Sequence, residues 1–236
     1  MAPKIIFANS RCGSSRWHAP VASHNFIHHG IGSIPGSEFL KDDQWFIDFG
    51  KQGRESEHYN FLYAFSMRYL NTIKDRIWFL EDCRELGLEF THKLKPKQMY
   101  RDNLIEWMLK FYKDWEIIRV CRRDNFRAGL SFVYQMQTNF KKSQYLMHHD
   151  SYEPQTEPFV VTNKDELVNY WKRNRQIENE TWGKKIYNED WNDKDITDWL
   201  EIPSDSIRHK KIPVDYEKLI INTDEVREWY DQFLQS

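Results

Sequence analysis

The spacing of apolar and polar positions along the chain predicts alternating strands and helices. Residues 4–10 form a short apolar run that ends in polar residues, and residues 115–123 form a second run rich in β-branched side chains. Runs of this length are typical of buried strands. Residues 88–94 alternate between apolar and polar side chains and predict a third, shorter strand.

Helical spacing fills the intervals between these strands. Apolar side chains recur at helical spacing over about 55–86, which predicts one long helix or two in series, and over 100–113 and 125–140, which predicts a helix in each range. Gly87 is placed to end the first of them. The order strand–helix–strand–helix–strand–helix favours an α/β fold, in which a parallel β-sheet is flanked by crossover helices.

The rest of the chain is less regular. Residues 142–200 are polar and rich in tryptophan, and we expect a partly helical insertion that forms a lid or shapes one side of a binding site. Residues 209–233 predict a strand, a turn and an amphipathic C-terminal helix. Because the chain shows no internal repeat, we expect a single domain over residues 1–236.

Composition narrows the possible functions. The 236 residues carry a formal net charge of −2, so no basic field points to nucleic acid as the partner. The three cysteines lie far apart and form no C-x-x-C pair, which is typical of a reducing compartment. The sequence contains neither an apolar run long enough to span a membrane nor the apolar segment of a signal peptide, and we expect a cytoplasmic protein.

The first strand leads directly into a loop of small residues and one arginine, Arg11-Cys12-Gly13-Ser14-Ser15. Glycine lets the backbone curl, the serines offer hydroxyl groups, and a following helix N-terminus adds partial positive charge. Arg11 supplies forked donors that suit a phosphate. The loop lacks the G-x-x-x-x-G-K-[ST] pattern of a P-loop kinase. It predicts either an anion-binding loop or a plain strand–turn–helix connection.

The second strand also runs into polar residues. Arg122, Arg123 and Asp124 follow its apolar part, which ends at Cys121, and Ser131 lies eight residues beyond Arg123 on the expected helix. In a parallel sheet both segments lie at the carboxyl ends of strands, where open α/β sheets bind ligands. Arg123 and Ser131 could therefore reach one phosphate group. The alternative is a surface pair of arginines, with Asp124 as a helix cap and Ser131 as an ordinary helix residue.

Together the two segments resemble the cofactor motifs of the sulfotransferases. R-C-G-S-S is similar to their 5′-phosphosulfate loop, and R-R-D-x6-S is similar to their 3′-phosphate motif. Within that superfamily the likeness is greatest to bacterial carbohydrate sulfotransferases that act on trehalose. The segments "IPGSEFL", "LEFTHKL" and "VDYEKLIINTDEVREWYDQFL" resemble further parts of that group. The resemblance implies a sulfotransferase-like fold, with a P-loop-like parallel sheet and a helical insertion.

The resemblance also implies a cofactor, 3′-phosphoadenosine 5′-phosphosulfate (PAPS), whose product is adenosine 3′,5′-bisphosphate (PAP). The residues expected at the 5′-phosphosulfate are Arg11, Cys12, Gly13, Ser14, Ser15 and Arg16. Arg123 and Ser131 would bind the 3′-phosphate, with Arg122 as the alternative arginine. PAPS chemistry needs no metal ion, and we expect none.

Three residues are implied in the transfer itself. Glu38 matches the general base that deprotonates the acceptor hydroxyl, or else is an ordinary loop carboxylate. Lys93 matches a lysine that contacts the transferring sulfuryl group, or else is an ordinary strand-end lysine. His18 is a second candidate base, because some sulfotransferases use histidine. Tyr216 is expected only to pack.

The sequence thus predicts a PAPS-dependent sulfotransferase. It would transfer a sulfuryl group to a hydroxyl of a carbohydrate or another small metabolite, with residues 142–200 covering the acceptor side. One alternative is a protein that kept the sulfotransferase fold for binding or structure and lost the reaction. The other is a nucleotide-dependent kinase, which the absence of the P-loop Lys-Ser/Thr pair disfavours.

Overall fold

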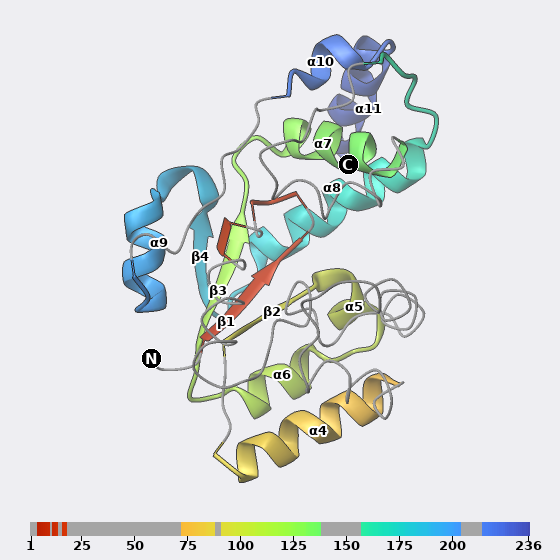
Figure 1. Ribbon diagram of the computed structural model, residues 1–236. Coiled ribbons are helices and arrows are strands. Elements are labelled where there is room, and N and C mark those ends of the chain that lie inside the picture. The colour runs from red at the N-terminus through yellow and green to blue at the C-terminus, as the bar shows by residue number, and fades with distance from the viewer. Residues whose placement is uncertain are drawn as a thin grey trace, which may run out of the picture.

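The fold is built around a parallel β-sheet with helices on both faces (Figure 1). The computed structural model describes residues 4–9, 11–13, 16–17, 72–87, 91–137, 157–203 and 214–236. Within these ranges the strands are β1 (Lys4–Ala8), β2 (His92–Leu94), β3 (Glu116–Cys121) and β4 (Lys184–Tyr187). Their spatial order is β2-β1-β3-β4, and every neighbouring pair is parallel.

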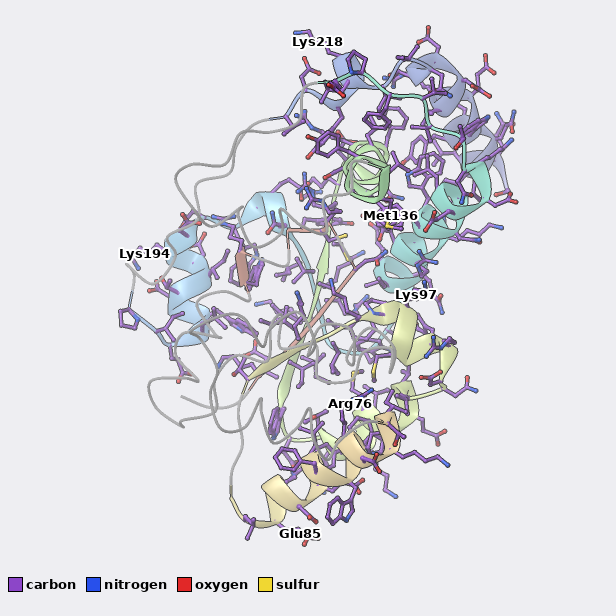
Figure 2. All side chains as sticks on the ribbon, turned by 45° about the vertical axis from the view of Figure 1, so that its right-hand side comes forward. Arg76, Glu85, Lys97, Met136, Lys194 and Lys218 are labelled. Carbon is purple, nitrogen blue, oxygen red and sulfur yellow. The ribbon has the colours of Figure 1, made fainter. Side chains whose placement is uncertain are left out.

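Helices cover the sheet and extend beyond its carboxyl edge (Figure 1). Those described are α4 (Ile73–Glu85), α5 (Pro96–Arg101), α6 (Ile105–Phe111), α7 (Asn125–Gln137), α8 (Lys164–Asn179), the 3-10 helix η3 (Asn188–Asp190), α9 (Asp193–Leu200), α10 (Tyr216–Leu219) and α11 (Thr223–Gln235). Charged side chains such as Lys194 and Lys218 lie at the periphery (Figure 2). Among the described helices, none combines the length and the apolar character that a membrane crossing requires.

Different helices pack against the two faces of the sheet. On one face, Ile6 and Ile118 pack with Trp17 and with the apolar side of α9. On the other face, Ile5 and Phe7 pack against α4, α5 and α6. All five side chains are fully buried, so successive residues of β1 enter opposite layers of core. Continuous apolar strands of this kind are typical of a parallel sheet covered on both faces.

A further core joins α7, α8 and α11 at one end of the sheet (Figure 1). Leu130 of α7, Trp171 of α8 and Phe233 of α11 belong to it. The close approach of α7 and α8 depends on Gly129, because a Cβ there would lie 2.3 Å from Trp171 Nε1. This core holds α7, and with it Ser131, in a fixed position relative to the sheet.

A buried arginine ties β3 to the end of α8. Arg119 donates from Nη1 to the carbonyl oxygens of Ile177, at 2.6 Å, and of Glu178, at 3.3 Å. Its guanidinium also lies over the ring of Trp182. The last carbonyl groups of a helix carry partial negative charge, so a cation stabilises them. Arg119 therefore fixes the C-terminal end of α8 against the sheet.

Several sequence predictions are confirmed. β1, β3 and α7 lie within the ranges predicted for them, α11 is the predicted C-terminal helix and runs on to Gln235, and Gly87 follows α4 with φ of +70°. The prediction of a single helix over 100–113 is wrong, because two separate helices, α5 and α6, lie in this region and a short non-helical segment joins them. Asn103 has φ of +53° at this break, and asparagine adopts this left-handed conformation more easily than most residues.

The sequence pattern missed β4. This strand lies inside residues 142–200, which we expected to form a helical insertion, yet it pairs with β3 as part of the sheet. Lys184 and Lys185 are exposed and only Ile186 is buried, so the strand lacks the apolar run that marks β1 and β3. At least this part of the segment belongs to the core of the fold.

Candidate functional site

The carboxyl ends of β1 and β3 meet where the strand order reverses. From β1 the chain passes to β2 on one side, whereas β3 lies on the other side of β1. A parallel sheet opens a crevice at such a switch point, and ligands bind there. The segments that begin at Arg11 and at Arg122 follow these two strands. The two predicted motifs are therefore neighbours in space.

The backbone after β1 is sharply curled. Arg11 has φ of +64° and Gly13 has φ of +82°, and a non-glycine residue in this left-handed region costs about 1 kcal/mol. The N–H of Arg16 closes the turn by donating to the carbonyl oxygen of Gly13 at 3.0 Å. A Cβ at Gly13 would lie 2.5 Å from the side chain of Asn188, so glycine is needed for space as well as for conformation. Curled backbone of this kind forms anion-binding concavities.

The first motif contacts the second directly. Arg11 Nε donates a hydrogen bond to Ser131 Oγ at 2.8 Å. Ser131 Oγ in turn donates to the hydroxyl of Tyr216 at 3.0 Å. Ser131 is only 8% exposed, so these bonds form in a setting with little water. The structure thus brings together Arg11 and Ser131, and it gives Tyr216 a polar contact that the sequence did not predict.

Both arginines after β3 are paired with carboxylates that follow β4. Arg123 donates to Asp190 from Nε at 3.0 Å and from Nη2 at 2.5 Å, and its guanidinium lies over the ring of Tyr187. Arg122 Nε lies 2.7 Å from a carboxylate oxygen of Glu189. The hydrogen bonds that Arg123 donates to Asp190 raise the pKa of its guanidinium, which stays charged. Asp190 holds the Nε/Nη2 edge of Arg123, so an anion that binds at this edge must displace the carboxylate.

The thiol of Cys12 points into the protein rather than toward a ligand. It is 2% exposed and lies within hydrogen-bond range of Tyr170 and Asn174 on α8. Asn174 also accepts from Asn9 at 2.6 Å and donates to Asn125 at 2.6 Å. This chain of side-chain amides links the loop after β1 to α8 and to the start of α7. It fixes the loop against α8 and the start of α7.

Cys12 is expected to resist alkylation in the folded protein. Burial raises the pKa of its thiol from 9.0 to about 11, so it remains protonated at about pH 8, and only the thiolate reacts. Peptide mapping after iodoacetamide treatment should find Cys12 unmodified until denaturant is added. Because the pKa is higher in the folded state, the stability contributed by the protonated thiol is complete below pH 9.0 and is lost as the pH rises toward 11. Labelling of folded protein at about pH 8 would contradict this buried placement.

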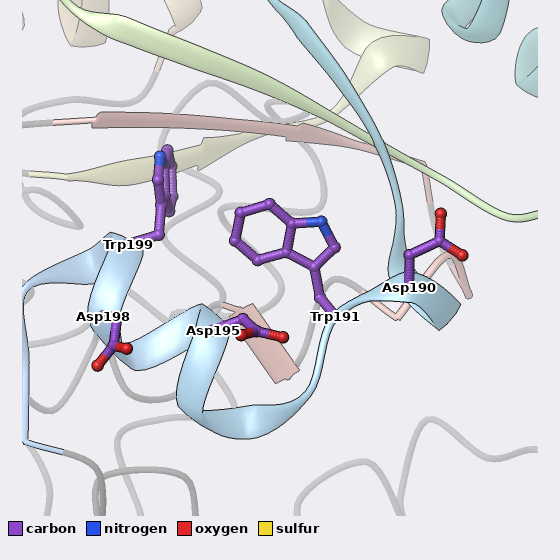
Figure 3. A pocket seen from close by; sticks show the side chains of 5 residues that line it. All are labelled: Asp190, Trp191, Asp195, Asp198 and Trp199. Carbon is purple, nitrogen blue, oxygen red and sulfur yellow. The ribbon is translucent and has the colours of Figure 1, made fainter.

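A hollow of about 370 Å³ lies beside the arginines, between η3 and α9 (Figure 3). It is lined by Asp190, Trp191, Asp195, Asp198 and Trp199. Figure 3 shows both indole rings on the side of α9 that faces the strands. Asp190 belongs to the hollow and also to the ion pair with Arg123, so the two features are contiguous.

Arg16 connects the loop after β1 to this hollow. Its Nη1 donates to the carbonyl oxygen of Trp191 at 2.6 Å, and its Nε donates to Asp193 at 2.5 Å. The next residue, Trp17, donates from Nε1 to Asn188 at 3.0 Å and packs against Trp191. Arg16 was expected to contact the cofactor, but its guanidinium is engaged with the segment that follows β4.

The remaining predicted residues are placed as follows. Lys93 lies in β2 beside Ile6 in the sheet register, is 4% exposed, and so lies on the face that α9 covers. Four candidates lie outside the described residues: Ser14, Ser15, His18 and Glu38. The described part of the crevice therefore consists of the curled loop, the two arginines after β3, and Ser131 with its partners.

Sequence reasoning missed the polar residues after β4. Asn188, Glu189 and Asp190 follow a parallel strand directly, which is the same signal that identified the other two motifs. They would have been found had β4 been recognised. Asn174 and Tyr216 carry no comparable signal, because their contacts depend on how α8 and α10 pack.

The chain matches no model of a known protein family, no curated protein and no solved structure. Relatives therefore supply no function, and only the chain's own residues and their geometry indicate one.

Proposed function

We propose that the protein is a PAPS-dependent sulfotransferase. The nucleotide would lie across the carboxyl ends of β1 and β3, and its sulfuryl group would pass to a hydroxyl of a carbohydrate or another small metabolite. The hydrogen bond of 2.8 Å between Arg11 Nε and Ser131 Oγ carries the proposal. It joins the two segments that resemble the 5′-phosphosulfate and 3′-phosphate motifs, and one ribose carries both of these groups in PAPS.

Local positive charge supports the proposal. The whole chain has a net charge of only −2, yet Arg11, Arg122 and Arg123 all follow strands that end at one crevice. The N-terminus of α7, at Asn125, comes directly after the second motif and adds the partial positive charge of a 13-residue helix. Guanidinium groups bind phosphate through paired, charge-assisted hydrogen bonds. The crevice thus offers three guanidinium groups to an anionic ligand, of which Arg122 and Arg123 are paired with Glu189 and Asp190 in this structure.

The proposed reaction exchanges one sulfur–oxygen bond for another. The acceptor oxygen forms a bond to sulfur, the bond from sulfur to the 5′-phosphate oxygen breaks, and PAP leaves with the electron pair. A base takes the acceptor's proton, for which Glu38 is proposed first and His18 second. Such transfers depend mainly on positioning and on charge stabilisation. Arg11 would stabilise the charge that develops on the leaving 5′-phosphate, and Lys93 is proposed to contact the sulfuryl group.

We place the acceptor in the hollow beside Asp190. The faces of Trp191 and Trp199 offer an apolar surface for a sugar ring, and carboxylate oxygens accept hydrogen bonds from hydroxyl groups. Asp190 and Asp198 are both paired with basic side chains, so the charge of these carboxylates is already balanced. Two of the three carboxylates that line the hollow are thus paired with a cation, and we propose a neutral acceptor for this lining.

Calorimetric titration with PAP tests the cofactor assignment. Wild-type protein is expected to bind PAP, and to bind adenosine 5′-phosphate more weakly because it lacks the 3′-phosphate. Absence of PAP binding would overturn the assignment. Transfer of labelled sulfate from PAPS to members of a carbohydrate panel then distinguishes a working transferase from a protein that only binds the nucleotide.

A further inference from the structure

Asp190 lies between the two parts of the proposed site. Its two carboxylate oxygens accept from Arg123 at 3.0 Å and 2.5 Å, and the same residue lines the hollow with Trp191 and Trp199. It is the last residue of η3, a single turn that follows β4 directly. Its carboxylate can therefore accept hydrogen bonds from Arg123 or from a ligand in the hollow. The hydrogen bonds that it accepts from one partner reduce those that it can accept from the other.

The contact that holds Asp190 against Arg123 is a surface ion pair. The two side chains are 45% and 58% exposed, and exposed pairs are weak because water and salt screen them. A phosphate presents the same two-pronged geometry to a guanidinium and carries more negative charge than a carboxylate. It can therefore replace Asp190 at Arg123. Glu189 faces the same competition at Arg122.

We infer that Asp190 is an internal competitor for the anion site and that it couples this site to the hollow. The inference rests on the proposed function for the identity of the anion, PAP or PAPS. In this structure the carboxylate of Asp190 holds the Nε/Nη2 edge of Arg123. When a phosphate takes Arg123, the carboxylate is released on the side of Trp191, where it accepts a hydrogen bond from a hydroxyl-bearing ligand.

This exchange couples the two binding events. A ligand in the hollow gains the free carboxylate when the anion has displaced it, and an anion gains the free edge of Arg123 when a ligand has drawn the carboxylate away. Each ligand then raises the affinity for the other, because a coupling between two binding equilibria is reciprocal. The two-state element that such a coupling requires would be the Asp190 carboxylate, which pairs with Arg123 in this structure and also lines the hollow.

The direction in which a mutation changes the affinity distinguishes an internal competitor from a residue that binds the ligand. Removing a group that contacts the ligand weakens binding, whereas removing an internal competitor strengthens it. Asp190→Asn keeps the size of the side chain and removes its charge. We expect it to lower the PAP dissociation constant about three- to fivefold, in keeping with the strength of an exposed ion pair. In an Arg123→Ala background the same change should have no effect, because the competitor acts through Arg123.

The experiment is a calorimetric comparison of five proteins. Wild type, Asp190→Asn, Arg123→Ala, the double variant and Asp198→Asn are each titrated with PAP and, separately, with inorganic pyrophosphate. Asp198 is the matched control, because it also lines the hollow but pairs with Lys194 instead of an arginine of the site. A second readout is tryptophan emission. PAP should change it in wild type, and the change should be lost in Trp191→Phe and in Asp190→Asn.

Each outcome supports or overturns the inference about Asp190, the cofactor assignment, or both. Tighter binding in Asp190→Asn alone, absent in the Arg123→Ala background, supports the inference. Unchanged or weaker PAP binding in Asp190→Asn overturns it, while PAP binding by wild type still supports the proposed function. If wild type binds pyrophosphate but not PAP, the cofactor assignment fails, and the pyrophosphate titrations decide the role of Asp190. Binding of neither probe overturns both proposals.

Discussion

The Arg11→Ala variant is expected to bind PAP about 100-fold more weakly than wild type. Arg11 is the cation of the curled loop, and its Nε already bonds to Ser131 of the second motif at 2.8 Å. Truncating a charged hydrogen-bond partner in a binding site costs about 3 kcal/mol, and each 1.4 kcal/mol corresponds to roughly a factor of ten in affinity. Titration calorimetry measures the loss, and circular dichroism verifies that the variant is folded.

Two further variants sharpen this result. Arg227→Ala removes the same charge from an exposed position of α11, where the guanidinium pairs with Glu217, and should change PAP affinity by less than about twofold. Arg11→Lys keeps the charge but loses the forked donors, and should lie between wild type and Arg11→Ala. If Arg11→Ala binds PAP as well as wild type does, the loop after β1 is not the anion site.

The Gly129→Ala variant is expected to lower the free energy of unfolding by about 3 kcal/mol. A Cβ at this position would lie 2.3 Å from Trp171 Nε1 and 2.9 Å from Leu167 Cδ1, and both side chains are fully buried. Overpacking of a close helix contact costs about 1–3 kcal/mol, and the clash with a large ring favours the upper end. Urea denaturation monitored by fluorescence measures the change.

Gly87→Ala is the matched comparison for this effect. Position 87 has open space around it but a φ of +70°, so alanine there should cost only the backbone strain of about 1 kcal/mol. Adding Trp171→Phe to Gly129→Ala should recover part of the loss, because phenylalanine lacks the indole nitrogen at the closest contact. Equal stability of wild type and Gly129→Ala would contradict the packing of α7 against α8.

The predictable part of the fold follows from strong local patterns. The apolar runs at 4–10 and 115–123 gave β1 and β3, because buried parallel strands need apolar side chains on both faces. β4 was not predicted, because this edge strand exposes Lys184 and Lys185 and buries only Ile186, and so lacks an apolar run. The break between α5 and α6 also escaped, since one asparagine in a left-handed conformation leaves little trace in the apolar pattern.

The candidate site was predictable to the same extent. Polar residues after β1 and β3 indicated the crevice, and the contact between Arg11 and Ser131 agrees with the prediction that these segments meet. The carboxylates of Glu189 and Asp190 were not foreseen, because their strand was not recognised. The sequence therefore indicated the arginines of the candidate site but not the carboxylates that pair with two of them.

The most direct test of a PAPS site compares two ligands on two proteins. Wild type and Arg123→Ala are each titrated with PAP and with adenosine 5′-phosphate, which differ only in the 3′-phosphate. If Arg123 binds that phosphate, the variant loses at least about tenfold in affinity for PAP and less than about twofold for adenosine 5′-phosphate. Equal losses for both ligands, or no loss for either, would contradict the assignment of Arg123 to the 3′-phosphate and with it the proposed PAPS site.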